Sequence, residues 1–280
     1  MHEKYPLVSN LRDPRFLTLL ALKSYTGRCR TGNYLIEGIR HLARAVEHNS
    51  PIEQLVADPS VLSNPFGQKL VRRLKQSGVP AIRLTPELYR ELTMANEPQG
   101  VCAVLRQQTT AIIDLKPARD SLWLAVESVD LPGNRGTILR TAEAAGVAGV
   151  FFLENSGQRS EQGSDPWDPA CVRASMGSIF GLRLVPCEMA EFVAWARRHR
   201  VAIVGSSPSG LLDFKALRCR WPAVLLVGSE RVGLSPQLME QSDLMVRIPM
   251  HGRCDSVNAA VAAGVLLFEM SSQRGLSSRG

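Results

Sequence analysis

Six apolar segments between residues 122 and 250 constrain the fold of this 280-residue chain more than any other feature. They read LWLAVESV (122–129), GVFFLE (149–154), LRLVP (182–186), VAIVGS (201–206), AVLLVGS (223–229) and LMVRIPM (244–250). Helices are expected between them, over 134–145, 169–179, 188–199 and 256–270. Near-continuous apolar strands that alternate with helices are typical of a parallel sheet covered on both faces. The sequence therefore predicts an α/β domain whose ligand lies in the loops that leave the carboxyl ends of its strands.

The first 107 residues predict a smaller α/β module. A helix is expected over 33–48, where apolar residues recur at helical spacing, namely Leu35, Ile36, Ile39, Leu42, Ala43 and Val46. A basic amphipathic helix over 66–78 and short strands over 52–58, 79–84 and 100–105 complete this module. The stretch 107–120 is polar, contains a proline and fits a linker between two domains.

The positive charge of the chain is concentrated in this first part. The formal net charge is +7, and residues 1–110 hold 15 Lys and Arg against 9 Asp and Glu, whereas the remainder holds 18 against 17. Arginine outnumbers lysine 27 to 6, which suits bidentate contacts with phosphate and is equally typical of the codon usage of a high-GC genome. A basic first part beside a near-neutral second part indicates that the first part binds a polyanion such as a nucleic acid.

The spacing of the cysteines predicts no metal site. The distribution of apolar residues predicts neither a signal peptide for export nor a membrane-spanning helix. The six cysteines are scattered singly, without the closely spaced pairs that zinc sites use. His41 and His48 share one helical face, lack a third ligand and are expected to be solvated. No stretch approaches the roughly 20 apolar residues that a bilayer requires, and no signal peptide is visible at the N-terminus. We therefore expect a cytoplasmic protein that binds no metal.

Two glycine-rich loops resemble phosphate-binding loops without matching them. The stretch DLPGNRGTILRTAEAAGV (130–147) follows a strand and begins a helix, but its glycines do not have the G-x-G-x-x-G spacing of dinucleotide-binding folds. In GSERVGLS (228–235) the glycines have P-loop spacing, but Leu234 stands where the phosphate-binding lysine belongs. The sequence therefore disfavours a dehydrogenase and a P-loop nucleotidase.

Three loops at strand ends remain as candidates for a binding site: LPGNRG, VGSERVGLS and IPMHGRCDSVNAA. They are rich in glycine and small polar residues, and an apolar strand that ends in Gly-Ser-Glu has no packing reason for its carboxylate. Converging loops of this kind would form a pocket of backbone groups with few side chains. Such a pocket suits a small amphipathic cofactor better than a polyphosphate.

These three loops resemble the motifs of the SpoU/TrmH branch of the SPOUT RNA methyltransferases. The first motif is Asn134, Gly136, Arg140, Thr141, Ala142 and Gly146. The second spans 226–234, with Gly228, Glu230 and Gly233. The third is Ile248, Pro249, Met250, Gly252, Ser256, Asn258 and Ala262. The segments YLIEGIRHLARAV and EPQGVCAVL resemble the L30e-like substrate-binding domain that some members carry.

The resemblance implies a domain arrangement and an assembly. It implies an N-terminal extension over 1–20, an L30e-like RNA substrate-binding domain over 21–107, a linker over 108–120, a SPOUT methyltransferase domain over 121–272 and a tail over 273–280. In this family the mostly parallel sheet of the methyltransferase domain contains a deep trefoil knot, S-adenosylmethionine binds in the knot, and two subunits form the active site. A homodimer is therefore expected.

The implied reaction is methyl transfer from S-adenosylmethionine to a ribose 2′-hydroxyl, most readily in ribosomal RNA of the 23S type. The implied catalytic residues are Arg140, Asn134, Glu230, Ser256 and Asn258. Arg140 would position the hydroxyl. Two roles are open to it, general base or electrostatic anchor for the phosphate and the developing alkoxide. A guanidinium is always protonated, so it is a poor base and is better suited to the second role. The sequence leaves both roles open.

Further residues are assigned by the same resemblance. Cofactor contacts are expected from Ser206, Leu226, Gly228, Ile248, Met250, Val257 and Asn258, and RNA contacts from Arg135, Arg140, Arg173, Arg40 and Arg44. One departure from the family is Ala260, where members often carry a second serine. A tRNA methyltransferase and a non-catalytic RNA-binding or ribosome-assembly factor on the same fold remain alternatives.

Overall fold

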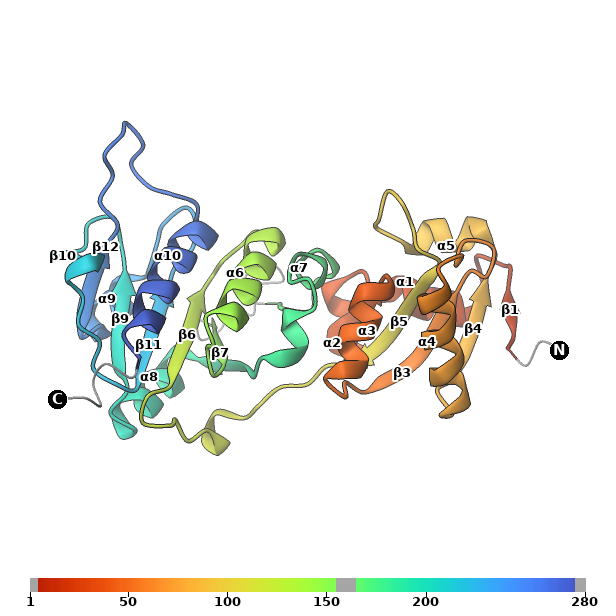
Figure 1. The fold of residues 1–280 in the computed structure, drawn as a ribbon, viewed down its shortest axis with the longest axis horizontal. Helices are drawn as coiled ribbons and strands as arrows, with labels where there is room; N and C mark the ends of the chain where they lie inside the picture. Colours follow the sequence, from red (N-terminus) through yellow and green to blue (C-terminus); the bar gives the residue numbers. More distant parts are fainter. Residues whose placement is uncertain (1–4, 155–164, 275–280) are drawn as a thin grey trace. The chain divides into compact units, whose positions relative to one another are not determined.

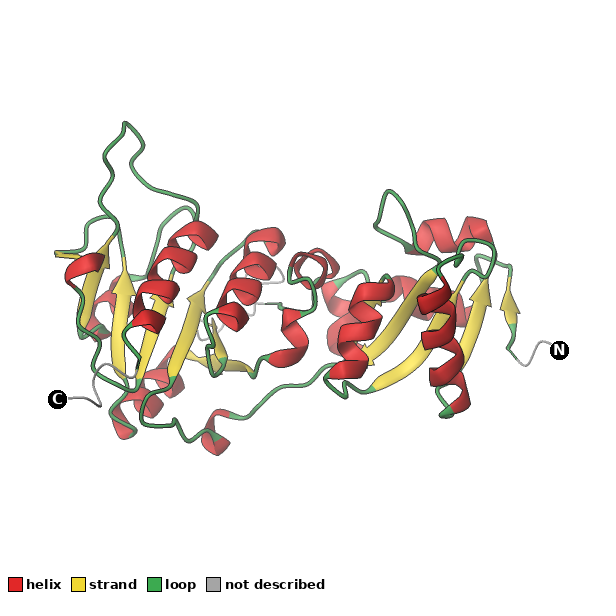
Figure 2. Cartoon of the chain, viewed as in Figure 1, coloured by secondary structure: helices red, strands yellow, loops and turns green. Residues whose placement is uncertain are grey.

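The computed structural model describes residues 5–154 and 165–274. The chain forms two compact units: the first comprises Met1–Gln107 with Pro166–Phe180, and the second Gln108–Asp165 with Gly181–Gly280. Each unit is an α/β structure with its own sheet (Figures 1 and 2).

In the described residues the first unit contains a five-stranded sheet of order β1-β4-β3-β5-β2. Its strands are β1 (Leu7–Val8), β2 (Asn33–Glu37), β3 (Ile52–Ala57), β4 (Ala81–Leu84) and β5 (Val101–Arg106), and β5 runs antiparallel to β2 and β3. Its helices are α1 (Pro14–Ala21), α2 (Tyr25–Thr31), α3 (Ile39–Glu47), α4 (Pro65–Gln76), α5 (Pro86–Leu92) and α7 (Pro169–Ala174).

The predicted helix over 33–48 is wrong in its first third. Residues 33–37 form β2, and the helix starts only after Gly38, whose φ of 94° is in the region that favours glycine. Tyr34, Leu35 and Ile36 are all buried, so both helical and strand spacing fit this run of apolar residues. The pattern alone could not locate the glycine as the boundary.

The expected N-terminal extension is part of the first unit where the structure describes it. Strand β1 pairs with β4, and α1 buries Phe16 and Leu19 in the same core as Leu84 and Tyr89. Segment 166–180, which the resemblance places in the methyltransferase domain, also belongs to this unit. Trp167 lies 6.5 Å from Tyr34 between ring centroids, and Arg28 forms a 3.7 Å ion pair with Asp168.

The described part of the second unit contains a seven-stranded sheet of order β10-β12-β9-β11-β6-β7-β8, in which every pair is parallel. The strands are β6 (Leu122–Glu127), β7 (Val150–Glu154), β8 (Leu184–Glu188), β9 (Ala202–Ser206), β10 (Leu212–Asp213), β11 (Ala223–Val227) and β12 (Leu244–Arg247). The helices are α6 (Pro132–Ala144), α8 (Met189–Arg198), α9 (Pro236–Gln241) and α10 (Ala259–Ser272), with 3-10 turns η1 (Ile112–Asp114) and η3 (Phe214–Ala216) here and η2 (Ser178–Gly181) at the unit boundary. The predicted parallel sheet is therefore confirmed.

Helices cover both faces of this sheet, as the apolar strands require. One face packs against α8 and α9, with Trp123, Phe151 and Trp195 at the centre of an aromatic cluster. On the other face α6 and α10 lie side by side (Figure 1). Within 108–120, the stretch expected to be a linker, Leu115 is buried on the sheet face that α8 and α9 cover, and its backbone oxygen accepts a hydrogen bond from Trp195 Nε1.

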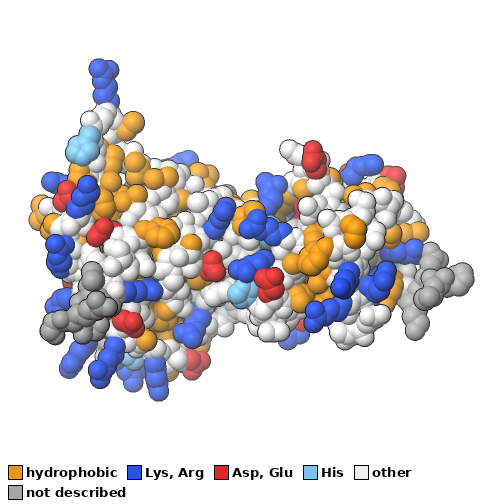
Figure 3. All heavy atoms as spheres, in the orientation of Figure 1, with side chains coloured by type: hydrophobic (Ala, Val, Ile, Leu, Met, Phe, Trp, Pro, Cys, Tyr) orange, Lys and Arg blue, Asp and Glu red, His pale blue; other side chains and the backbone are white. Residues whose placement is uncertain are grey.

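Charge is distributed unevenly over the second unit. Figure 3 shows Lys and Arg side chains gathered at the end of this unit where the strand arrows of Figure 2 begin. None of the helices formed by the described residues is long and apolar enough to cross a membrane.

Candidate functional site

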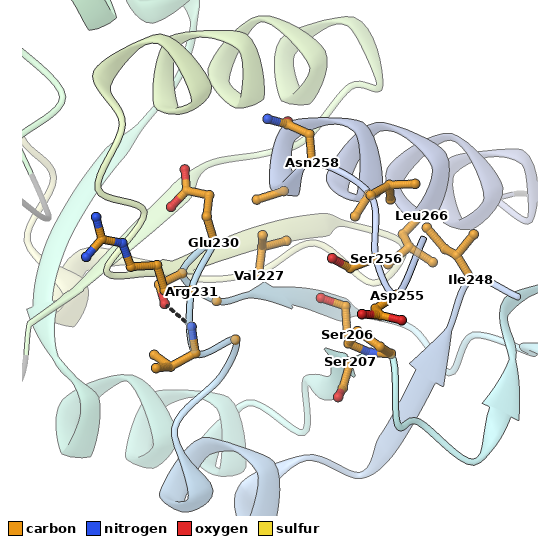
Figure 4. A pocket seen from close by; sticks show the side chains of 18 of the residues that line it. Ser206, Ser207, Val227, Glu230, Arg231, Ile248, Asp255, Ser256, Asn258 and Leu266 are labelled. Carbon is orange, nitrogen blue, oxygen red and sulfur yellow. Dashed lines mark hydrogen bonds between the residues drawn. The ribbon is translucent and has the colours of Figure 1, made fainter. Parts of the chain in front are cut away.

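A cavity of about 540 Å³ lies where β9, β11 and β12 end (Figure 4). The loops that follow these three strands line it together with the first turns of α6 and α10. Figure 4 shows Ser206, Ser207, Asp255 and Ser256 on one side of the cavity, with Glu230 and Arg231 on the other. Adjacent parallel strands end at the same edge of the sheet, so this is where an α/β fold of this kind places a ligand.

A chain of hydrogen bonds joins the three loops that the sequence singles out. Asn134 Nδ2 donates to Glu230 Oε1 at 2.6 Å, and Asn258 Nδ2 donates to Asn134 Oδ1 at 3.1 Å. The second carboxylate oxygen, Glu230 Oε2, accepts from the backbone N–H of Asp130 at 3.2 Å. Residues more than ninety positions apart therefore hold one another at the rim of the cavity.

Asn258 also caps helix α10. Its Oδ1 accepts hydrogen bonds from the backbone N–H groups of Ala260 at 2.8 Å and Val261 at 3.4 Å, which would otherwise lack a partner. Because the same amide also donates to Asn134, the start of α10 is tied to the loop that begins α6. The asparagine thus has a structural role alongside the catalytic role that the resemblance implies.

The loop 228–235 is folded tightly against itself. Ser229 and Gly233 exchange two backbone hydrogen bonds of 3.1 and 3.0 Å, and Gly233 has a φ of 71°. A side chain on Gly228 would meet the backbone carbon of Gly233 at 2.1 Å, so only glycine fits there. This close approach explains the paired glycines without any role in phosphate binding.

Glu127 is a supporting residue that sequence reasoning missed. It ends β6, is only 5% exposed, and its Oε2 accepts from the backbone N–H of Ser235 at 2.7 Å. The carboxylate thereby fixes the end of the loop 228–235. The one signal for Glu127 in the sequence was a carboxylate in an otherwise apolar strand, where packing gives no reason for a charge.

Apolar side chains form much of the cavity wall. Val227, Val246, Ile248, Met250 and Leu266 line it, opposite polar groups of Ser206, Glu230, Asp255 and Ser256. Besides predicted residues, the lining includes residues that the sequence did not single out: Leu131, Ser207, Pro208, Arg231, Val232, Met239, Asp255, Ala259 and Leu266. Asp255 lies within the quoted third motif, and Ser207 directly follows Ser206, so proximity along the chain was the available signal.

The predicted cofactor residues largely come together in this cavity. Ser206, Gly228, Ile248, Met250, Val257 and Asn258 all line it. Leu226 does not, because its side chain is fully buried on the sheet face covered by α8 and α9. It contributes only its backbone oxygen, which accepts from Ser206 Oγ at 2.8 Å.

The predicted catalytic residues are divided between two places. Asn134, Glu230, Ser256 and Asn258 line the cavity, whereas Arg140 is exposed on α6 and does not. Arg140 lies six positions after Asn134 on α6. Because a helix of 3.6 residues per turn rotates about 100° per residue, the two side chains point about 120° apart. Within the described residues the Arg140 guanidinium has no hydrogen bond or ion pair, so it is available to another molecule.

Arg135 differs from the expectation that it contacts RNA. It is 3% exposed, and its Nη1 donates to the backbone oxygens of Val129 at 2.6 Å and Asp130 at 3.2 Å. The guanidinium thus holds the turn between β6 and α6 from inside. In this structure Arg135 positions the loop that carries Asn134, and its side chain is buried within the protein.

The other predicted RNA contacts lie in the first unit. Arg40 is exposed on α3, Arg44 is half-buried and pairs with Glu47 at 3.1 Å, and Arg173 is exposed and donates to the backbone oxygen of Met94 at 3.0 Å. The packing of 166–180 onto this unit brings Arg173 and α3 into the same compact body.

His41 is buried beneath these arginines, so the expectation that it is solvated is wrong. It is 7% exposed, and its Nε2 has no hydrogen-bond partner. Burial lowers the pKa of this imidazole, an effect that backbone groups of Glu37, Val172 and Arg173 oppose. Burial likewise raises the pKa of Glu37, which accepts hydrogen bonds from Thr93 and Met94. Glu37 and His41 therefore both favour their neutral forms. A buried neutral imidazole contributes to packing and is poorly suited to binding phosphate.

The donor set of the cavity suits a small organic cation and offers no metal site. Among the described residues no three His, Cys, Asp or Glu side chains are grouped so that they could hold a metal ion. The cavity instead combines an apolar wall with the carboxylates of Glu230 and Asp255. Its volume lies within the usual range of small-molecule sites, roughly 300–1,000 Å³. A nucleoside with a positively charged side group fits this arrangement chemically.

Fold and cavity together define an α/β protein with a small-molecule site at the carboxyl edge of a parallel sheet. Residues 121–268 match the model of the SpoU rRNA methylase family, and residues 14–103 match the model of the MRM3-like substrate binding domain. The chain belongs to the SpoU rRNA methylase family.

Similar proteins span almost the whole chain. A 23S rRNA (uridine(2479)-2′-O)-methyltransferase of Streptomyces viridochromogenes is 32% identical over 271 residues, covering 94% of this chain and 91% of that protein. A crystal structure of an AdoMet-bound rRNA methyltransferase from Sinorhizobium meliloti has 28% identity and a TM-score of 0.85, covering 96% of this chain and 98% of that one. The SpoU methyltransferase AviRb of S. viridochromogenes, in complex with AdoMet, has 30% identity and a TM-score of 0.83, covering 94% and 98%.

These comparisons confirm the family and the two kinds of domain that the sequence predicts. The methylase family model ends at residue 268, within α10, and the substrate-binding model begins at residue 14, where α1 begins. The fold class is confirmed as well, because structures of similar length superpose on both parts of the chain.

Proposed function

We propose that this protein transfers a methyl group from S-adenosylmethionine to a ribose 2′-hydroxyl of ribosomal RNA. The observation that carries the proposal is the cavity at the ends of β9, β11 and β12, whose rim is held by the Glu230–Asn134–Asn258 chain of hydrogen bonds. Family membership and two similar crystal structures that contain AdoMet support the same reaction. Ribosomal RNA is proposed because two relatives are named as 23S rRNA 2′-O-methyltransferases, one acting on a uridine and one on a guanosine.

The cavity residues would hold the cofactor through complementary chemistry. Val227, Ile248 and Leu266 offer an apolar wall to the adenine ring, and Glu230 and Asp255 offer negative charge to the cationic part of the molecule. When bound, S-adenosylmethionine supplies a methyl group activated by an adjacent sulfonium. The protein's contribution is to hold the acceptor oxygen about 3 Å from that methyl group.

Arg140 is proposed to act on the RNA in the cavity of a partner subunit. Its guanidinium points away from Asn134 and does not line the cavity of its own chain, so a second copy is the simplest way to bring the two together. As a permanently charged group it would anchor the phosphate next to the target ribose and stabilise negative charge that develops on the 2′-oxygen. Asn134 and Glu230 would orient the groups around that oxygen.

The proposed homodimer has a suitable surface on α10. Three apolar residues follow one another along the helix at spacings of four and three: Val261, Val265 and Phe268, which are 53%, 37% and 53% exposed. Such a stripe on one helix is typical of a covered interface. Because α6 packs beside α10, a partner on this stripe would also lie near Arg140. The trefoil knot stays a prediction of the family resemblance, as does the cytoplasmic location.

The proposal is tested by separating cofactor binding from methyl transfer. The protein should bind S-adenosylmethionine in calorimetry and transfer labelled methyl groups to ribosomal RNA. Arg140→Ala should keep the affinity for the cofactor within about twofold and lose at least a hundredfold in transfer rate, because an electrostatic donor at the reacting oxygen is worth about 2.7–4 kcal/mol. Arg90→Ala, which removes an exposed arginine from α5, is the control and should behave as the parent.

Two outcomes would contradict the assignment. Full transfer activity in Arg140→Ala would remove this residue from the site. Absence of cofactor binding at millimolar concentration would favour the non-catalytic RNA-binding factor. Transfer to tRNA with none to ribosomal RNA would move the proposal to the other RNA class.

A further inference from the structure

Cations lie within six residues before the starts of four strands of the second sheet, β9, β11, β6 and β8, at the edge opposite the cavity. Arg198 and Arg200 precede β9, Arg218 and Arg220 precede β11, Lys116 and Arg119 precede β6, and Arg183 precedes β8. The register places these strand starts side by side, since Ala223 pairs with Ala202 on one side and with Leu122 on the other. Parallel strands that begin at one edge therefore collect cations from segments that are far apart in sequence.

The side chains at this edge are exposed and mostly without partners. Among the described residues, no hydrogen bond or ion pair engages the side chains of Lys116, Arg119, Arg183, Arg198, Arg200 or Arg220. Arg218 donates only to backbone oxygens of its own turn, and Arg197 is the member already paired, with Asp243 at 2.6 Å. Two carboxylates lie at the same edge: Asp120, two residues before β6, and Asp243, which directly precedes β12 and is the partner of Arg197. The edge therefore carries a net positive charge that the described residues do not neutralise.

The opposite edge carries the acidic residues. Glu127, Glu154 and Glu188 end β6, β7 and β8, and Glu230 and Asp255 lie in the cavity loops. Arg231 also lines the cavity and Arg247 ends β12, so this edge has mixed charge, whereas the edge where the strands begin is mainly cationic. A group of Lys and Arg side chains in Figure 3 lies at the end where the strands begin.

We infer that this edge, formed by Lys116, Arg119, Arg183, Arg198, Arg200, Arg218 and Arg220, is a second contact surface for RNA. The inference rests on the proposed function, because the occupant is the phosphate backbone of the same large RNA whose nucleotide enters the cavity. Unpaired arginines make bidentate contacts with phosphate, and several phosphates spaced along a strand match cations drawn from separate turns. A neutral or acidic protein surface offers no such match.

The distance between this edge and the cavity determines which RNA molecules can contact both. Strand β11 has five residues, which span about 17 Å at roughly 3.3 Å per residue. A fragment of two or three nucleotides, at roughly 3.4 Å per stacked nucleotide, is shorter than this span and does not reach the edge, whereas a folded RNA domain does. The edge should strengthen binding of large RNA without changing the reaction at the cavity.

The test compares two double variants that remove the same charge. Arg198→Gln with Arg220→Gln changes the edge, and Arg15→Gln with Arg106→Gln removes two exposed arginines of the first unit that are already paired, with Asp13 and Glu53. Binding of a ribosomal RNA domain of several hundred nucleotides and of a short single-stranded fragment around the methylated nucleotide is measured at several salt concentrations. Calorimetry with S-adenosylmethionine checks that the cavity is intact.

The edge variant should bind the large RNA at least fivefold more weakly, and its plot of log affinity against log salt should be shallower by roughly 1.4–1.8, from about 0.7–0.9 for each lost phosphate contact. It should bind the short fragment and the cofactor as the parent does, and the control should change large-RNA affinity less than twofold. Equal weakening by both variants, or unchanged affinity and slope in the edge variant, would overturn the inference. A changed oligomeric mass of the edge variant without a change in RNA binding would assign the edge to a protein contact and overturn it too. Loss of cofactor binding by the parent would instead contradict the proposed function while leaving the RNA comparison readable.

Discussion

Single residues of the same type have different roles within one short motif. Arg135 and Arg140 are five positions apart on α6, yet Arg135 is buried and holds two backbone oxygens while Arg140 is exposed. A helix turns about 100° per residue, so five positions place the two side chains on different faces. The sequence identified both as candidates for RNA contact, but only the packing of the turn before α6 distinguishes them.

Asn134 links the other two loops of the site, because it donates to Glu230 and accepts from Asn258. Asn134→Ala should lower the rate of methyl transfer by roughly tenfold or more, since hydrogen bonds to charged groups contribute about 1.5–3 kcal/mol. Affinity for S-adenosylmethionine, measured by calorimetry, should change only a few-fold. Thr137→Ala, on the same helix, removes a hydroxyl that bonds only to the backbone of Gly133 and serves as the control.

A parental rate in Asn134→Ala would show that the hydrogen-bonded chain is dispensable for the reaction. An equal loss in the Thr137→Ala control would instead point to a general weakening of α6.

At the scale of elements, the strands of the second unit were predictable because burial on both faces leaves almost no polar residue in them. Each of the six predicted strands is present, with ends shifted by at most a few residues. The two-residue strand β10 and the short helix α9 have too few residues for a periodic pattern and were not predicted. Strand β2 was mistaken for helix because its boundary depends on one glycine, Gly38.

Helix α10 presents an apolar stripe that a monomer would leave in water. Val265→Glu with Phe268→Glu should convert the proposed dimer into a monomer, because two charges would be buried without partners in the interface. Sedimentation should report the mass of one chain for this variant and of two for the parent, and methyl transfer should fall with the dimer. Leu211→Glu changes another exposed apolar residue of the same unit, 92% exposed, and should leave the dimer intact.

A parent that sediments as one chain at micromolar concentration would contradict the dimer, as would a double variant that remains dimeric. Either result would also remove the reason for placing Arg140 in a partner's cavity.

At the scale of the whole molecule, the order of elements along the chain does not state which unit each joins. Segment 166–180 follows a strand of the second unit but packs against the first, through Trp167 with Tyr34 and Asp168 with Arg28. The mainly cationic edge where the strands of the second sheet begin is equally invisible to a count of charges. Both features depend on contacts between residues far apart in sequence, which periodicity and composition do not encode.

The candidate site was more predictable than the surface around it. Its three loops follow strands of one parallel sheet, so their convergence follows from the fold, and nine of the predicted residues line the cavity: Asn134, Ser206, Gly228, Glu230, Ile248, Met250, Ser256, Val257 and Asn258. The supporting contacts of Glu127 and Arg135 were missed because both are charged side chains buried by tertiary packing.

The most direct test of the central claim is chemical identification of the product. Ribosomal RNA from cells that lack this protein is incubated with the purified protein and S-adenosylmethionine bearing a deuterated methyl group, then digested to nucleosides for mass spectrometry. We expect the label in one 2′-O-methylated nucleoside, with the extra mass on the ribose. Label on a base, or no label in RNA from a protein that binds the cofactor, would contradict it.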